Sequence, residues 1–482
     1  MAEAVLAARP AVAARWPVMP LLLVVMVGSG CAALGYQIVW TQQAALWLGH
    51  EAAAALAVVS AFFGGLALGA GGLGAVIDRS VRPSWWYAGC EWAIAAWGVV
   101  LAVALQPASL ALSLLLGPAP TAAWQSLVTF GATFMLLLPA TMAMGATLPA
   151  MARLLAQQRA GGAPIALLYA GNTLGGVLGV LAVAFWWLPQ WGLSAAALAC
   201  AALNLVCAAA VLLVEPSRVL MAVPALPVRG LAPVVHGAEF DHRGLTATLA
   251  LTGLLGIGYE VVVLRVLSQV AENTVYTLAL MLAVYLVGTA LGAAAWARWG
   301  PLWRASAATR RFRLLLALGL ACLLSGAALW FVPWFKAMLT AVLDGGLGAA
   351  LAAEGALAVL AFGAPTVVMG ALFSHLCEEA RTQGLRFSAA LAINTAGAAL
   401  APVLWGAGLV VGLGSRWRCW RLLAAIWHWL RLACAQRAGP GRGLQRSSWR
   451  WPQRWAWHRH WSWWTCPPAP PCSATAKAHW AP

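Results

Sequence analysis

Residues 35–70 read GYQIVWTQQAALWLGHEAAAALAVVSAFFGGLALGA, two apolar segments around a short polar break at Gly49, His50 and Glu51. Residues 258–293 read GYEVVVLRVLSQVAENTVYTLALMLAVYLVGTALGA and align with the first stretch without a gap. The identical pairs gather at the two ends, as Gly-Tyr at the start and Gly-x-Ala-Leu-Gly-Ala at the finish. A stretch that returns at an offset of 223 residues predicts an internal repeat.

Two shorter motifs return in the same order. Met144-Gly145-Ala146 returns at residues 369–371, an offset of 225. The motif Asn-Thr-x-Gly that contains Asn172 and Gly175 returns with Asn394 and Gly397, an offset of 222. Three motifs at a nearly constant offset predict that the chain is a tandem of two halves.

The composition excludes a water-soluble globular protein. The chain of 482 residues is 63% hydrophobic and 9% charged, with a mean hydropathy of +0.82, whereas soluble domains carry about 25% charged residues. Apolar runs of about 20 residues, each long enough to cross a bilayer, recur throughout the chain. Since such uniformly apolar runs can satisfy their backbone groups in lipid only as helices, we expect an all-α integral membrane protein.

The apolar runs predict eleven membrane-spanning helices and a degraded twelfth at about residues 419–435. The eleven are expected at residues 18–46, 53–77, 86–106, 124–150, 164–189, 193–214, 247–270, 275–297, 312–334, 348–375 and 388–411.

The cationic residues between these spans predict their orientation. With the N-terminus in the cytoplasm, 16 arginines lie in cytoplasmic loops and a single cation, Lys336, lies in the opposite loops. Such a bias follows the positive-inside rule and places both halves in the membrane in the same direction. We therefore expect a multi-pass protein of a bacterial inner (plasma) membrane.

Two parallel six-helix repeats are the plan of major-facilitator-type transporters. The only mixed-charge, proline-containing stretch lies between the halves and is the natural boundary. We assign residues 1–214 to the first repeat, 215–246 to a cytoplasmic linker, 247–415 to a second repeat of five spans, and 416–482 to an aberrant tail.

One loop between the second and third spans resembles the loop motif of the major facilitator superfamily. It consists of Gly74, then Asp78 and Arg79, then a basic residue, Arg82. The carboxylate of Asp78 could pair with arginine side chains or with a helix N-terminus, and so hold the two halves in one state. The alternative is a plain cationic cytoplasmic loop.

Polar side chains inside the spans are costly and therefore informative. Glu260 and Arg265 in the seventh span align with Gln37 and Gln42 in the first, so the same two positions are polar in both halves. With Tyr36 and Tyr259 they are expected to face each other around a central cavity; the alternative is that they only hold helices together. Glu91 in the third span is a further cavity candidate, with the same alternative.

Four other polar positions are expected to have structural or solvated roles. Asn172 and Asn394, with Gly175 and Gly397, are interpreted as a repeated helix-packing motif because small residues let helices approach closely. Glu354 and His375 lie near the ends of predicted spans and are expected to be solvated or interfacial.

At these residues the chain resembles a known family. SGCAALGYQIVW, FFGGLALGA, Asp78-Arg79, LLLPATMAMGATLPAMAR and LYAGNTLGGVLG are similar to the membrane region of the fused major-facilitator/spermidine synthase family, over residues of about 20–415. In many members a soluble domain follows that resembles spermidine synthase and would bind decarboxylated S-adenosylmethionine and a polyamine. The family-typical arginine is Gln42 in the first half, whereas Arg265 keeps it in the second.

The chemistry of such a domain is not expected in this chain. There is no glycine-rich loop between a strand and a helix, and residues 380–482 contain no Asp or Glu. We predict no catalytic residue, no metal and no cofactor, and no nucleic-acid partner. The expected partners are the lipid bilayer, a small cationic solute, and an aminopropyltransferase domain that is lost or supplied separately.

The tail differs from the rest of the chain. Residues 416–482 hold 11 of the 29 Lys and Arg residues, 12 of the 29 tryptophans and no acid. One interpretation is a basic segment on an anionic membrane surface. The other, which we favour, is a reading-frame shift near residue 416 that replaced an ordinary twelfth span.

Two functions follow from these observations. The first is a membrane transporter, which moves polyamines or other small solutes. The alternative is a membrane anchor or scaffold for a spermidine synthase-like aminopropyltransferase whose catalytic domain is missing from this chain.

Overall fold

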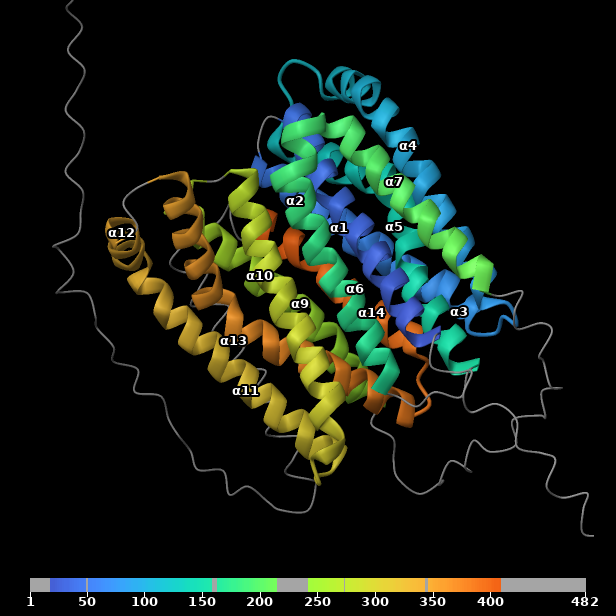
Figure 1. Ribbon diagram of the computed structural model, residues 1–482. Coiled ribbons are helices and arrows are strands. Elements are labelled where there is room, and N and C mark those ends of the chain that lie inside the picture. Colours follow the sequence, from blue (N-terminus) through green and yellow to red (C-terminus); the bar gives the residue numbers. More distant parts are fainter. Residues whose placement is uncertain are drawn as a thin grey trace, which may run out of the picture. The chain divides into compact units, whose positions relative to one another are not determined.

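The computed structural model describes residues 18–48, 51–157, 163–214, 242–272, 274–342 and 346–408 (Figure 1). The chain divides into two units, Met1–Cys434 and Ala435–Pro482, and every described residue belongs to the first. The predictions for the tail, for the degraded twelfth span and for most of the linker lie outside the described residues. The division into two repeats therefore stays a prediction.

The described residues form helices and no strands. The α-helices are α1 (Val18–Leu48), α2 (Glu51–Leu68), α3 (Gly74–Ile77), α4 (Pro83–Leu116), α5 (Ala122–Gln157), α6 (Ala163–Ala182), α7 (Leu188–Val214), α9 (His242–Leu267), α10 (Val275–Trp299), α11 (Ala307–Ala328), α12 (Val332–Val342), α13 (Leu347–Thr382) and α14 (Phe387–Ala401). Ten stretches of the described chain are long and apolar enough to cross a membrane. The prediction of an all-α membrane protein is confirmed.

One of the ten stretches is unusually long, because Ile165–Leu213 runs through α6 and α7. The sequence predicts two spans here, divided between residues 189 and 193. Gly192 lies at that division with φ of 77°, a left-handed conformation that interrupts the helix and that glycine adopts without strain. The kink is thus located where the sequence predicts a boundary.

Local sequence explains how several helices begin and end. Pro83 occupies the first turn of α4, where its missing N–H costs nothing. The hydroxyls of Thr274 and Ser306 accept hydrogen bonds from the backbone N–H groups of Thr277 and Thr309 and so cap α10 and α11. Gly384, with φ of 82°, forms the turn between α13 and α14.

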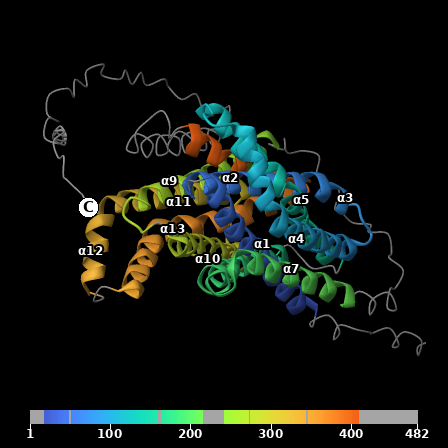
Figure 2. The same cartoon turned by 90° about the horizontal axis from the view of Figure 1, so that it is seen from above.

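Helix pairs that are distant in sequence pack against each other (Figures 1 and 2). In the N-terminal part α1 packs against α6, and α2 against α5; in the C-terminal part α9 packs against α14, and α10 against α13. Two further contacts connect these parts, α2 with α14 and α6 with α10. These two contacts form the seam along which the candidate site lies.

Glycine sets the distance within two of these pairs. A Cβ atom at Gly175 of α6 would overlap the carbonyl oxygen of Val27 in α1, and one at Gly397 of α14 would overlap that of Ala250 in α9. Any larger residue would push the helix backbones apart. The repeated Asn-Thr-x-Gly motif therefore lies at the closest approach of each pair.

Candidate functional site

The loop after α3 contacts the N-terminus of α14. The hydroxyl of Ser388 donates a hydrogen bond to Oδ2 of Asp78 at 2.5 Å, and the Nε of Arg386 lies 4.0 Å from the same oxygen. Arg386 also donates to the carbonyl oxygen of Ala75 at 3.5 Å. Gly74 is buried at this contact, since a Cβ there would press on the Cβ of Ser388 at 2.8 Å. We call the contact of Asp78 with Ser388 and Arg386 the latch.

The two arginines of the motif do not take part in the latch. Arg79 and Arg82 are exposed. The loop is instead attached to α5, because Arg153 donates to the carbonyl oxygen of Ser80 at 3.4 Å and Gln157 to that of Val81 at 3.2 Å. Of the predicted motif, Gly74 and Asp78 make the contact between distant helices.

Glu91 of α4 is fully buried between α1 and α7. Its carboxyl accepts a hydrogen bond from the hydroxyl of Ser29 at 2.5 Å and another from the amide of Asn204 at 2.5 Å. The side chain is enclosed by helices of the N-terminal part. It joins three helices and does not line an open cavity.

The polar positions of α9 have three different environments. The hydroxyl of buried Tyr259 donates to the carbonyl oxygen of Ala361 in α13 at 2.7 Å. Glu260 is partly exposed, and no hydrogen bond or ion pair holds its carboxylate among the described residues. Arg265 is exposed in the last turn of α9. Glu260 and Arg265 do not pair with each other.

The corresponding positions of α1 are more buried. Tyr36 is fully buried and stacks on Trp40 with ring centroids 4.9 Å apart. Gln37 is buried, and its backbone carbonyl accepts from Thr41. Gln42 is partly exposed.

The expectation that Tyr36 and Tyr259 face each other needs correction. Tyr36 belongs to an apolar cluster formed mainly by helices α1 to α7, with Ala279 of α10, whereas Tyr259 belongs to a separate cluster with residues of α13. Each tyrosine packs within its own part of the chain. Among the predicted cavity positions, Glu260 and Gln42 remain partly accessible inside their helices.

Glu354 was expected to be solvated or interfacial; it is not solvated, since it is 1% exposed. Its carboxylate accepts from the backbone N–H of Glu272 at 2.8 Å and from the hydroxyl of Thr277 at 2.7 Å. The segment between α9 and α10 is also bound by Lys336, whose ammonium group donates a hydrogen bond to the carbonyl oxygen of Val270 at 2.7 Å. Glu354 thus supplies negative charge at the N-terminus of α10, where the helix dipole favours it.

His375 was also expected to be solvated or interfacial, and it is not solvated either, since it is 1% exposed. Its Nε2 lies 3.1 Å from the carbonyl oxygen of Ala307 in α11 and 3.7 Å from Oε2 of Glu379. Its ring lies 4.8 Å from that of Trp296. His375 connects α13 to α11 and α10.

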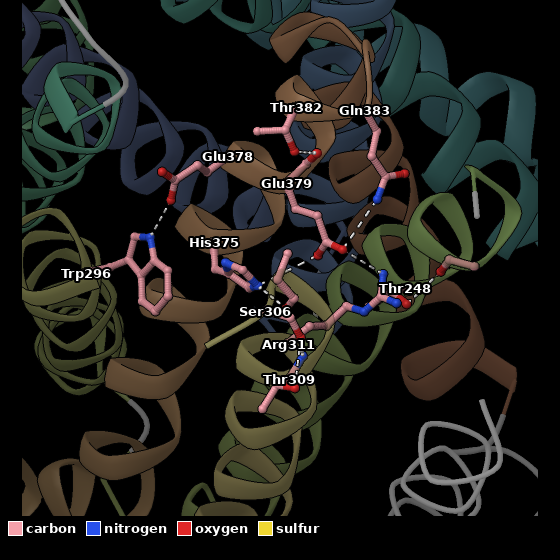
Figure 3. Close-up of polar contacts among 12 residues, drawn as sticks. Thr248, Trp296, Ser306, Thr309, Arg311, His375, Glu378, Glu379, Thr382 and Gln383 are labelled. Atoms are coloured by element: carbon pink, nitrogen blue, oxygen red, sulfur yellow. Dashed lines mark hydrogen bonds and ion pairs between the residues drawn. The ribbon is translucent and has the colours of Figure 1, made fainter. Parts of the chain in front are cut away.

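Sequence reasoning missed the polar cluster around His375, shown in Figure 3. Arg311 of α11 forms an ion pair with Glu379 of α13 at 3.3 Å, and Gln383 donates to the same carboxylate at 3.4 Å. We call the contacts of Glu379 with Arg311, His375 and Gln383 the buried ion-pair cluster. His375 and Glu379 are four residues apart on one helix face, a spacing that the sequence offers as a signal.

Trp296 extends this region toward a small pocket. Its Nε1 donates to Glu378 at 3.2 Å, and Arg310 lies over its ring at 5.8 Å. The pocket is lined mainly by residues of α6, α10 and α13, including Tyr169, Trp296 and Phe373, with Phe387 of α14.

The two asparagines of the repeated motif make different contacts with neighbouring helices. Asn394 donates to the carbonyl oxygen of Leu249 at 3.0 Å and to the hydroxyl of Thr252 at 3.2 Å, so it connects α14 to α9. At Asn172 of α6 the contact is made by the backbone carbonyl oxygen, which packs closely against Gly30 of α1.

No group of three His, Cys, Asp or Glu side chains suited to a metal ion occurs in the part of the chain that the structure describes. Comparison with protein-family models and with curated proteins finds no match for this chain. The helices define a polytopic membrane protein that lies in a lipid bilayer. Its function must therefore be argued from its own residues.

Proposed function

We propose that this protein is a membrane transporter of the major-facilitator type, made of two parallel six-helix repeats. Support comes from the matched helix contacts, since α1 with α6 corresponds to α9 with α14, and α2 with α5 corresponds to α10 with α13. The close approaches also correspond: Gly65 packs against Thr141 and Gly288 against Thr366, at offsets of 223 and 225. The resemblance to the membrane region of the fused spermidine synthase family points in the same direction.

The observation that carries the proposal is the latch. It connects the loop after α3 with α14, which lie 310 residues apart in sequence, across the seam between α2 and α14. Its ion pair is partly exposed, with 47% of the Arg386 side chain accessible, and such pairs contribute about 0–1 kcal/mol. A contact this weak can open and close during a transport cycle.

The environment of Glu260 supports the proposal that the transported solute is cationic. Glu260 lies within the membrane-spanning part of α9, is partly exposed as a residue, and has no cation beside its carboxylate among the described residues. An unpaired acid inside a membrane protein attracts positive charge. Polyamines or other small cationic solutes fit this requirement, and the proposed setting is a bacterial inner membrane with the N-terminus in the cytoplasm.

The proposal is tested by flux into proteoliposomes. Purified full-length protein is reconstituted and presented with labelled polyamines, with an anionic solute of similar size as control. We expect uptake of the polyamine alone, and a loss of at least tenfold in Glu260→Gln at equal protein content. Folded protein that moves neither solute contradicts the proposal and favours the alternative, an anchor for a separate aminopropyltransferase.

A further inference from the structure

Glu91 is the most completely enclosed acid among the described residues, with 0% of its surface exposed. It lies in the stretch Pro83–Ala104, one of those long and apolar enough to cross a membrane. Hydrogen bonds to it come from Ser29 of α1 and Asn204 of α7, and the phenol of Tyr87 also lies beside it; all three groups are neutral. This arrangement raises the question of what balances the charge of the carboxyl group.

No cationic side chain in the described part of the chain faces this carboxyl group. The titratable groups that lie near it are phenols and thiols from each helix packed around it: Tyr36 of α1, Tyr87 and Cys90 of α4, and Cys207 of α7. The ion pairs of the described residues involve other acids, Asp78 and Glu379. A phenol or a thiol cannot neutralise a carboxylate.

Burying an ionised carboxylate without a cation is strongly unfavourable, and a group in that position takes up a proton instead. A neutral carboxyl group keeps both contacts: Oε2 still accepts from the amide of Asn204, whereas a protonated Oε1 donates to the oxygen of Ser29, so the direction of that hydrogen bond is reversed. The hydroxyl of Ser29 can accept as well as donate, so the proton also finds an acceptor without any movement of heavy atoms.

We propose that Glu91 is a proton-binding site: its carboxyl group carries a proton at neutral pH and joins α1, α4 and α7 as a neutral hydrogen-bonding group. The site is separate from Glu260, which lies on α9 and is partly exposed. The inference stands whether or not the protein is a transporter.

The test is an infrared difference spectrum of full-length protein in lipid nanodiscs at neutral pH. Subtracting the spectrum of Glu91→Gln from that of the wild type isolates the vibrations of one carboxyl group. We expect the loss of one carbonyl band of a protonated carboxylic acid. The loss of carboxylate bands instead would overturn the proposal, and so would failure of this neutral isostere to fold.

A second variant tests the same group without removing it. Ser29→Ala takes away one hydrogen bond to the carboxyl group and should shift a protonated-carboxyl band to higher frequency; a shift confined to carboxylate bands contradicts the proposal. The matched control is Glu378→Gln, which replaces an exposed glutamate that accepts from Trp296. This control should lose carboxylate bands only.

Discussion

The latch and the buried ion-pair cluster are both acid–base contacts at helix ends, but they differ in exposure. In the latch, 47% of the Arg386 side chain and 21% of that of Asp78 are accessible, and the charged atoms lie 4.0 Å apart. In the cluster, the corresponding values for Arg311 and Glu379 are 13% and 4%, with a separation of 3.3 Å. The partners of the latch are also much farther apart in sequence.

This difference indicates which contact can switch. Water screens an exposed pair, so breaking it costs little, whereas a buried pair that loses one member leaves an uncompensated charge. The cluster connects α11 and α13, neighbours that also share extensive helix packing. We infer that the cluster fixes helices in place and that the latch opens and closes.

The largest effect is expected for Arg311→Gln. Removing the guanidinium takes away the cation that lies 3.3 Å from the buried carboxylate of Glu379, and breaking a buried pair typically costs about 3–5 kcal/mol. Thermal or denaturant unfolding in detergent would measure the loss. The control is Arg313→Gln, an exposed arginine on the same helix, for which a change within about 0.5 kcal/mol is expected. Equal stability of the two variants would contradict a structural role for the cluster.

A smaller effect is expected for Ser388→Ala. The change removes the hydroxyl that donates to Asp78, a hydrogen bond that contributes about 1 kcal/mol. The latch should therefore open about five times more often, and amide hydrogen exchange in residues 74–82 should quicken by that factor. Exchange in residues 375–383, which include the buried ion-pair cluster, should not change. Equal acceleration of both segments would show general destabilisation instead of latch opening.

The smallest effect is expected for Arg386→Gln. Because this arginine is half exposed and 4.0 Å from the carboxylate, its loss should cost about 0–1 kcal/mol and quicken exchange in residues 74–82 less than Ser388→Ala does. High salt should reproduce this effect in the wild type. If Arg386→Gln quickened exchange more than Ser388→Ala, the ion pair would contribute more to the latch than the hydrogen bond of Ser388, which contradicts the expected order.

The sequence predicted the helices better than their polar contacts. Apolar runs of spanning length predict the long described helices but not the short α12, and Gly192 lies where the pattern predicts an interruption. The aspartate of the latch was predicted because its motif is local. Its partner Ser388 was not, since a serine at a helix start carries no signal for a contact 310 residues away.

The errors have a common physical cause. Glu354 and His375 were expected to be solvated or interfacial because they lie near predicted span ends, yet neighbouring helices and connections cover both. Tyr36 and Tyr259 occupy equivalent positions in the alignment but face different helices. Position along one helix predicts depth in the membrane, whereas burial depends on which other helices pack around it.

The central claim, that the latch must open for transport, is tested most directly by closing it covalently. In a chain with its ten cysteines replaced, Asp78→Cys and Ser388→Cys introduce two thiols at positions whose native side-chain oxygens lie 2.5 Å apart. After oxidation and verification of the disulfide by mass, we expect polyamine flux in proteoliposomes to stop and to return on reduction. Cross-linked protein that carries the solute as fast as the reduced protein would contradict the account.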